Sequence, residues 1–139
     1  MRNILFLFFA CFPLMMCSQQ TESLKEKFED YFLIGATINQ EDYQLIDKDE
    51  KILEIVSEDF NSVTPENSMK WMHSHPEYSK FTFSNAQKIT DFSKDNNMYL
   101  LGHTLVWHNQ VPDYVSEIKE KTKFNLHLKN HISLTTSLG

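Results

Sequence analysis

Residues 102–110 read Gly-His-Thr-Leu-Val-Trp-His-Asn-Gln and follow directly on a short apolar run. Apolar and β-branched residues dominate the wider segment 98–107, which predicts a buried strand that emerges into a loop. Side chains two residues apart in a strand share a face, so His103, Leu105 and Trp107 would point the same way. A polar His and a bulky Trp on that face indicate the floor of a pocket. A hydrogen-bonded core His beside a core Trp explains the same spacing equally well.

Two further strands are expected upstream of this segment. Residues 31–38 are apolar without alternation, which is typical of a strand buried on both faces. Residues 61–64 form a shorter strand, and Pro65 ends it because proline cannot donate a ladder hydrogen bond. A loop is expected over residues 39–47, and a turn of helix over residues 68–71.

An amphipathic helix follows each expected strand. The first covers residues 49–60, the second begins after an N-cap at Ser84, and the third begins at Thr122. Alternation of strands and helices predicts parallel β/α units with functional residues after the strand ends. No glycine-rich loop follows a strand, so nucleotide binding loses its main support. The apolar stripes are Ile52, Leu53, Val56 and Phe60, then Ala86, Ile89 and Phe92, then Phe124, Leu128 and Ile132.

Composition narrows the class of protein. The length of 139 residues suggests one domain at most, and a net charge of −6 argues against nucleic acid as a partner. Both cysteines, Cys11 and Cys17, lie in the apolar leader. Cleavage before Cys17 would therefore leave neither a disulfide nor a cysteine metal site in the mature chain.

The first 16 residues are expected to be a signal peptide of the lipoprotein type. Arg2 supplies a short basic region, and residues 4–16 are almost wholly apolar but shorter than the roughly 20 residues of a spanning helix. Residues 14–17, Leu-Met-Met-Cys, resemble a bacterial lipobox, although the Met before Cys17 replaces the usual small residue. Lipid modification of Cys17 is preferred over ordinary secretion, and residues 17–27 would form a tether.

Two motifs carry a family resemblance. Residues 65–71 read Pro-Glu-Asn-Ser-Met-Lys-Trp, and residues 102–112 extend the first quoted stretch with Val-Pro. In this order and at this separation they resemble glycoside hydrolase family 10, the endo-1,4-β-xylanases. Similarity runs over residues 28–132, and residues 133–139 form a divergent tail. The resemblance implies an α/β fold holding the first three β/α units of a (β/α)8 TIM barrel, which would be incomplete.

The resemblance also implies a substrate and a set of contacts. The family hydrolyses internal β-1,4 bonds of xylan with retention, so xylan or xylo-oligosaccharides would be the partner. No cofactor or metal is expected. Carboxylate, amide and ammonium groups can read paired sugar hydroxyls, and an indole can cover a pyranose face. The positions that match family sugar contacts are Glu66, Asn67 and Lys70 on the non-reducing side, and His103, Trp107 and Gln110 around the cleavage point.

Simpler interpretations remain for the same residues. Glu66 and Lys70 have the i,i+4 spacing of a helical ion pair, and Asn67 could form an Asx turn or a helix cap. His73 and His75 lie in a polar loop and are expected to be solvated rather than to bind a metal. Two neighbours are expected to serve packing or structural roles, Trp71 and His108.

The family's catalytic carboxylates are missing from this sequence. A retaining glycosidase needs two of them, about 5–5.5 Å apart. The family takes them from a Trp-Asp-x-x-Asn-Glu segment and a Thr-Glu-x-Asp segment, and neither occurs here. The chain is therefore expected to be inactive alone. The alternatives are a non-catalytic xylo-oligosaccharide-binding lipoprotein and a non-functional truncated product. An unpaired outer strand edge would make either marginally stable.

Overall fold

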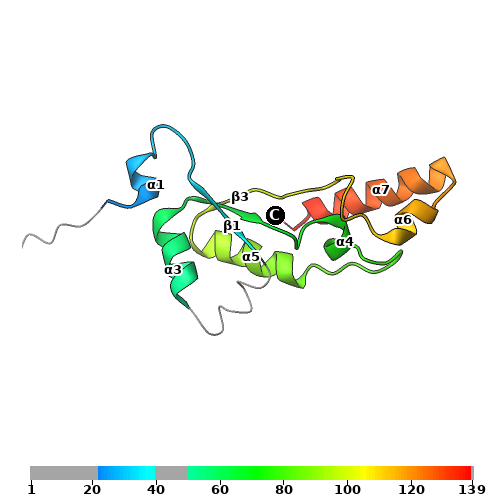
Figure 1. Cartoon of the computed structure of the whole chain (residues 1–139), viewed down its shortest axis with the longest axis horizontal. Coiled ribbons are helices and arrows are strands. Elements are labelled where there is room, and N and C mark those ends of the chain that lie inside the picture. Colours follow the sequence, from blue (N-terminus) through cyan, green and yellow to red (C-terminus); the bar gives the residue numbers. More distant parts are fainter. Residues whose placement is uncertain (1–21, 40–49, 139) are drawn as a thin grey trace, which may run out of the picture.

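The computed structural model describes residues 22–39 and 50–138 (Figure 1). The expected leader, Cys17 and most of the expected loop at 39–47 lie outside the described residues. The elements run in the order α1 (Leu24–Lys27), β1 (Gly35–Ile38), α3 (Glu50–Asp59), β2 (Ser62–Pro65), α4 (Trp71–Ser74), α5 (Ser84–Asp95), β3 (Tyr99–Leu100), α6 (Asp113–Glu117) and α7 (Lys121–Thr136).

The described strands form one parallel sheet in the order β1-β2-β3. Gly35 pairs with Ser62 at the start of the first ladder, and Val63 pairs with Leu100 in the second. Parallel neighbours need a crossover connection, which α3 supplies between β1 and β2 and α5 supplies between β2 and β3. The prediction of parallel β/α units is confirmed.

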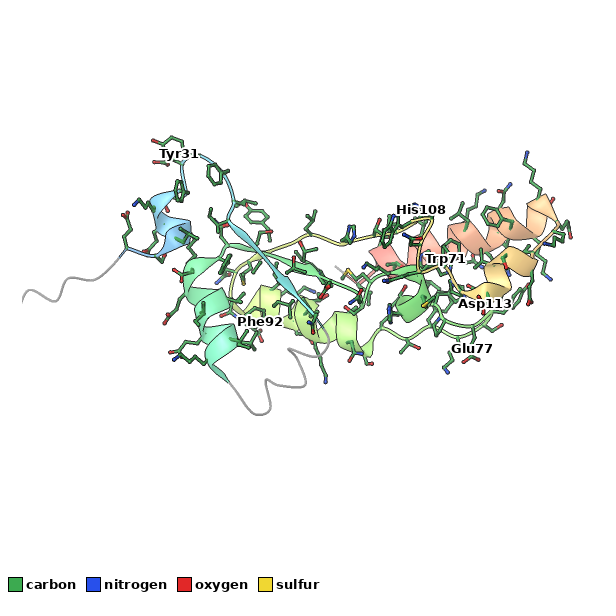
Figure 2. All side chains as sticks on the ribbon, in the orientation of Figure 1. Tyr31, Trp71, Glu77, Phe92, His108 and Asp113 are labelled. Carbon is green, nitrogen blue, oxygen red and sulfur yellow. The ribbon has the colours of Figure 1, made fainter. Side chains whose placement is uncertain are left out.

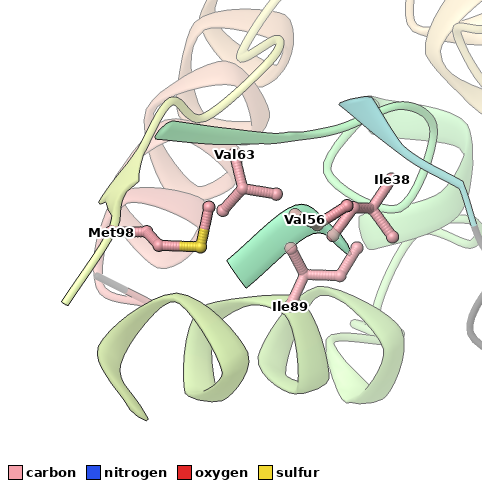
Figure 3. Close-up of a cluster of buried hydrophobic side chains, with 5 residues drawn as sticks. All are labelled: Ile38, Val56, Val63, Ile89 and Met98. Carbon is pink, nitrogen blue, oxygen red and sulfur yellow. The ribbon is translucent and has the colours of Figure 1, made fainter. Parts of the chain in front are cut away.

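The core lies between the sheet and the helices α3 and α5. Ile38 of β1 and Val63 of β2 meet Val56 of α3 and Ile89 of α5, and Met98 closes the cluster (Figure 3). All five side chains are buried. Burial of one such side chain stabilises the fold by about 1.5–3 kcal/mol, so this small cluster is the main apolar support of the sheet.

The first strand is shorter than predicted and is not buried on both faces. It begins at Gly35, while Tyr31, Phe32 and Leu33 are exposed. The amides of Tyr31 and Phe32 both donate to the carbonyl of Phe28, which turns the chain before the ladder starts. Among the described residues β1 pairs with β2 alone, so its other edge has no strand to bury it.

The third strand also ends earlier than predicted, at Leu100 rather than near Trp107. The amides of Tyr99 and Leu101 donate to the carbonyls of Asn61 and Val63. The next hydrogen bond of this parallel pattern would run from the nitrogen of residue 65 to the Leu101 carbonyl. Pro65 has no N–H, so the ladder stops there. The expected common face of residues 103, 105 and 107 is therefore not a strand face.

The helices agree with the predicted order and differ in detail. In α5, Ala86 and Ile89 are buried as expected, but Phe83 is the N-cap and Ser84 is the first helical residue. Ile52 of α3 is exposed, which the predicted stripe did not anticipate. The short helix α4 begins at Trp71 rather than at residue 68, and α6 was not predicted. No helix in the described ranges is long and apolar enough to cross a membrane.

Helix α7 buries polar side chains where an apolar stripe was predicted. Phe124, Leu128 and Ile132 are only half-buried, and the fully buried positions are His127, His131 and Thr135. The two stripes are adjacent on the helix, because residues three and four apart share a face. The helix also continues past Ile132 to Thr136, into the segment expected to diverge.

Candidate functional site

The two sequence motifs meet at the carboxyl end of the sheet. Glu66 follows β2 directly, and its amide donates to the carbonyl of Ile38 at 2.9 Å. The chain then turns, since the amide of Lys70 donates to the carbonyl of Asn67 at 2.9 Å. The second motif leaves β3 at the same edge of the sheet. We call residues 102–112 the site loop. Trp71 and His108 lie toward the α6–α7 end of the molecule, opposite Tyr31 (Figure 2).

Lys70 joins the two motifs. Its Nζ donates to Oδ1 of Asn67 at 2.9 Å and lies 5.2 Å from the ring centroid of Trp107. That distance is within the range of a cation–π interaction. The proposed i,i+4 ion pair with Glu66 does not form, because the ammonium faces the amide and the indole instead. An ammonium has three donors, so this one retains capacity for ligand oxygens.

The side chains that Lys70 joins differ in their exposure. Lys70 is 9 % exposed, whereas 37 % of Trp107 remains exposed. His103 is exposed as well, so the interpretation of a core His beside a core Trp is wrong. A mostly buried ammonium beside a partly exposed indole face offers one charged donor and one flat apolar surface to the same ligand.

Gln110 holds the far end of the site loop. Its backbone has φ 53°, in the left-handed region that non-glycine residues seldom occupy. Its carbonyl accepts a hydrogen bond from the amide of Met72 in α4 at 2.9 Å. The side-chain Oε1 is buried without a hydrogen-bond partner among the described residues. Strained backbone and unsatisfied polar atoms are typical of functional sites.

The remaining two predicted residues are less closely placed. Glu66 and His103 are both exposed and follow the ends of neighbouring strands. Within the predicted set, all of which the structure describes, neither forms a hydrogen bond to another member. The peptide bond between His103 and Thr104 is cis. The structure therefore brings Lys70 into contact with both Asn67 and Trp107 and leaves Glu66 and His103 exposed.

A cluster of aromatic and histidine rings with a buried centre was not predicted. The Trp71 ring stacks on His131 with centroids 4.2 Å apart, and its Nε1 donates to the Tyr114 hydroxyl at 3.0 Å. His75 is buried and stacks on Phe81 at 3.9 Å, so the expectation of a solvated His75 is wrong. The i,i+4 spacing of the histidines in α7 was the one available sequence signal for this cluster. Its members are Trp71, His75, Tyr78, Phe81, Tyr114, His127 and His131.

Burial shifts the ionisation of the cluster. It lowers the pKa of His75 and of His131, and hydrogen bonds to the carbonyls of Tyr78 and Leu105 only partly oppose this. Burial also raises the pKa of Tyr114. No group of three or more His, Cys, Asp or Glu residues in the described ranges could hold a metal ion. The lowered pKa values of His75 and His131 favour their neutral imidazole forms.

A pH dependence of stability follows from these shifts. Burial also lowers the pKa of His73, with a further contribution from the charge of Lys70. The folded chain then binds fewer protons than the unfolded chain below about pH 6.5, the ordinary pKa of histidine. Stability is fully present above that pH and is lost as the pH falls toward the lowered pKa values. We expect the melting temperature, followed by circular dichroism, to fall by several degrees between pH 7 and pH 5.

The substitution His75→Phe provides the control for this prediction. It keeps an aromatic ring against Phe81 and removes one of the shifted imidazoles. The pH dependence of the variant should therefore be flatter than that of the wild type. A melting temperature that stays constant from pH 7 to pH 5 in the wild type would contradict the assignment.

Comparison with known proteins gives a consistent result. Residues 23–137 match the sequence model of the family described as Glycosyl hydrolase family 10. The chain is 42% identical over 93 residues to Endo-1,4-beta-xylanase A of Caldicellulosiruptor saccharolyticus, which covers 67% of this chain and 26% of the relative. It is 41% identical over 110 residues to a Beta-1,4-xylanase of Dictyoglomus thermophilum, which covers 79% of this chain and 29% of the relative.

Comparison with solved structures gives the same result as the sequence comparison. Xylanase 10B from Thermotoga petrophila, crystallised with xylobiose, superposes with a TM-score of 0.77 at 38% identity, covering 85% of this chain and 36% of that one. Native xylanase 10B from Thermotoga maritima gives a TM-score of 0.75 at 38% identity, covering 83% of this chain and 36% of that one. This chain thus spans about a quarter to a third of the length of these relatives.

Proposed function

Because this chain belongs to glycosyl hydrolase family 10 and forms an incomplete part of its TIM barrel, we propose that it is the N-terminal part of a retaining endo-1,4-β-xylanase. In this proposal its described residues bind the sugars of xylan on the non-reducing side of the cleaved bond. The observation that carries the proposal is the contact of Lys70 with both Asn67 and Trp107, which joins the two motifs.

The chemistry of Asn67, Lys70 and Trp107 suits a pentose chain. A xylose ring presents hydroxyls that both donate and accept, and the Lys70 ammonium and Asn67 amide can pair with adjacent ones. The exposed part of the Trp107 indole can cover the apolar face of a ring. Gln110 adds an amide oxygen with no partner among the described residues. Glu66 and His103 add exposed polar groups.

Hydrolysis requires more than this set. A retaining glycosidase uses an acid/base and a nucleophile, both carboxyl groups. Of the six predicted contact residues only Glu66 carries a carboxylate, and its family role is binding. We therefore propose that this chain binds xylo-oligosaccharides but does not cleave them alone. The alternative of a dedicated binding lipoprotein shares that behaviour.

Export as a lipoprotein is a separate part of the proposal. It rests on the sequence of residues 1–17 alone, with Cys17 as the lipid-modified first residue of the mature chain. Mass spectrometry of the exported N-terminus separates the outcomes. A lipid-modified Cys17 is expected, and an unmodified mature N-terminus in the culture medium would show ordinary secretion.

Calorimetric titration with xylohexaose tests the binding role. We expect measurable binding without product formation. Lys70→Ala should weaken the affinity about 10- to 100-fold, because a hydrogen bond from a charged donor contributes about 1.5–3 kcal/mol. Trp107→Ala should have an effect of similar size, because the apolar stacking surface is lost.

The matched control is Lys80→Ala. This variant removes an exposed lysine that pairs with Glu77 at 2.8 Å, so it should leave the affinity unchanged. Absence of binding by the folded wild type would refute the binding role. Release of shorter xylo-oligosaccharides by the purified chain would refute the proposed lack of hydrolysis.

A further inference from the structure

We propose that His131 is a positioning residue that holds the site loop in the shape that presents Trp107 to a sugar. The proposal rests on the sugar-binding function given above. Helix α7 contributes none of the predicted sugar contacts. The proposal gives it a direct role in placing Trp107 relative to Lys70.

Few hydrogen bonds anchor the site loop to the rest of the chain that the structure describes. Within the described part of the chain, hydrogen bonds hold the stretch from Leu101 to Gln110 at three points. The Leu101 amide and the Gln110 carbonyl bond at the two ends. Between them, Nε2 of His131 lies 2.7 Å from the carbonyl oxygen of Leu105. His131 is therefore the anchor at the middle of the loop, two residues before Trp107.

His131 also contacts the other motif. Its ring lies parallel to that of Trp71, at an interplanar angle of 4° and a centroid distance of 4.2 Å. Trp71 directly follows Lys70 in the chain. One side chain thus touches both the ring of the residue that follows Lys70 and the loop that carries Trp107. In our proposal it fixes the relative position of the Lys70 ammonium and the Trp107 ring, which lie 5.2 Å apart.

The burial and hydrogen bonding of His131 account for a histidine at this position. His131 is 0 % exposed, and a buried polar ring is unfavourable unless it is hydrogen-bonded. A carbonyl only accepts, so Nε2 carries the proton, and Nδ1 is buried without a partner among the described residues. A leucine would fill the space at lower cost if packing were the only role. The donor to Leu105 is what an apolar residue could not supply.

Two variants of His131 and one control separate the roles of the donor and the ring. His131→Phe keeps a ring that can stack on Trp71 and removes the donor. His131→Gln places an amide nitrogen near the position of Nε2 and removes the ring. His127→Phe is the control, since His127 is buried on the same helix and contacts Tyr78 rather than the site loop.

Two readouts are measured on the full chain. Titration with xylohexaose gives the affinity. The indole N–H resonances in a proton–nitrogen NMR spectrum report the surroundings of the two tryptophans of the sequence, assigned with Trp71→Phe and Trp107→Phe. We expect His131→Phe to weaken the affinity about tenfold and to shift the Trp107 resonance. His131→Gln should restore the affinity to within about threefold of the wild type, and His127→Phe should leave the Trp107 resonance in place.

The proposal is overturned if folded His131→Phe binds as tightly as the wild type with an unmoved Trp107 resonance. If His131→Phe does not fold, His131→Asn replaces it, because its shorter amide cannot reach Leu105. Equal affinities of His131→Asn and His131→Gln would then overturn the proposal. If the wild type does not bind xylohexaose, the proposed function fails, while the Trp107 resonance still decides the role of His131.

Discussion

Replacement of Ile89 by alanine is expected to remove a large part of the folding stability of the chain at 25 °C. Ile89 is 1 % exposed and lies on α5 against the buried side chains of both β1 and β2. An Ile→Ala change in a packed core costs about 2–5 kcal/mol. Small domains have a total stability of only about 5–15 kcal/mol, and this one rests on a single small apolar cluster.

Urea unfolding followed by circular dichroism measures this loss. The matched control is Ile55→Ala, the same substitution at an exposed position of α3. Its effect should stay within about 0.5 kcal/mol, as for other surface substitutions. An Ile89→Ala variant that unfolds cooperatively at the same urea concentration as the wild type would show that the core lies elsewhere.

Completion of the barrel is expected to change the activity from undetectable to readily measured. The test joins residues 22–138 to the remaining β/α units of xylanase 10B from Thermotoga maritima, whose structure this chain matches over 83% of its own length. The added units would cover the outer edge of β3, where Tyr99 and Leu101 are exposed. They would also supply the two carboxylates that retaining hydrolysis requires. Enzymes typically accelerate reactions by at least about 10⁶-fold. The gain in xylan hydrolysis should therefore be unmistakable if Asn67, Lys70 and Trp107 are correctly placed.

Two controls make this result interpretable. The added units alone should release no sugar from xylan. The Lys70→Ala form of the fusion should be about 10- to 100-fold less active, as expected for loss of a charged hydrogen bond to substrate. A folded, monomeric fusion that does not hydrolyse xylan would contradict the assignment of Asn67, Lys70 and Trp107 as sugar contacts.

Local pattern and motif predicted different parts of this molecule. The alternation of apolar runs with amphipathic segments was sufficient for the parallel sheet and for the core positions Val56, Ala86 and Ile89. The contact of Lys70 with Trp107 joins residues far apart in the chain. No local spacing encodes it, and only the pair of motifs indicated that the two belong to one site.

The errors have physical causes that a single segment does not reveal. The third strand was predicted too long because its end depends on a residue of the neighbouring strand, Pro65. The stripe on α7 was misplaced because His127 and His131 were counted as polar. They are buried because Tyr78, Leu105 and Trp71 provide them with aromatic and carbonyl partners from other elements.

The proline at the end of β2 also marks the place where the paired strands end and the site loop begins. Pro65 has no N–H, so β2 offers no further donor to β3 after the Leu101 amide has bonded to the Val63 carbonyl. Beyond Leu101 the chain continues as the loop that His131 contacts at Leu105 and that carries Trp107. The start of this loop thus coincides with a missing donor on the neighbouring strand.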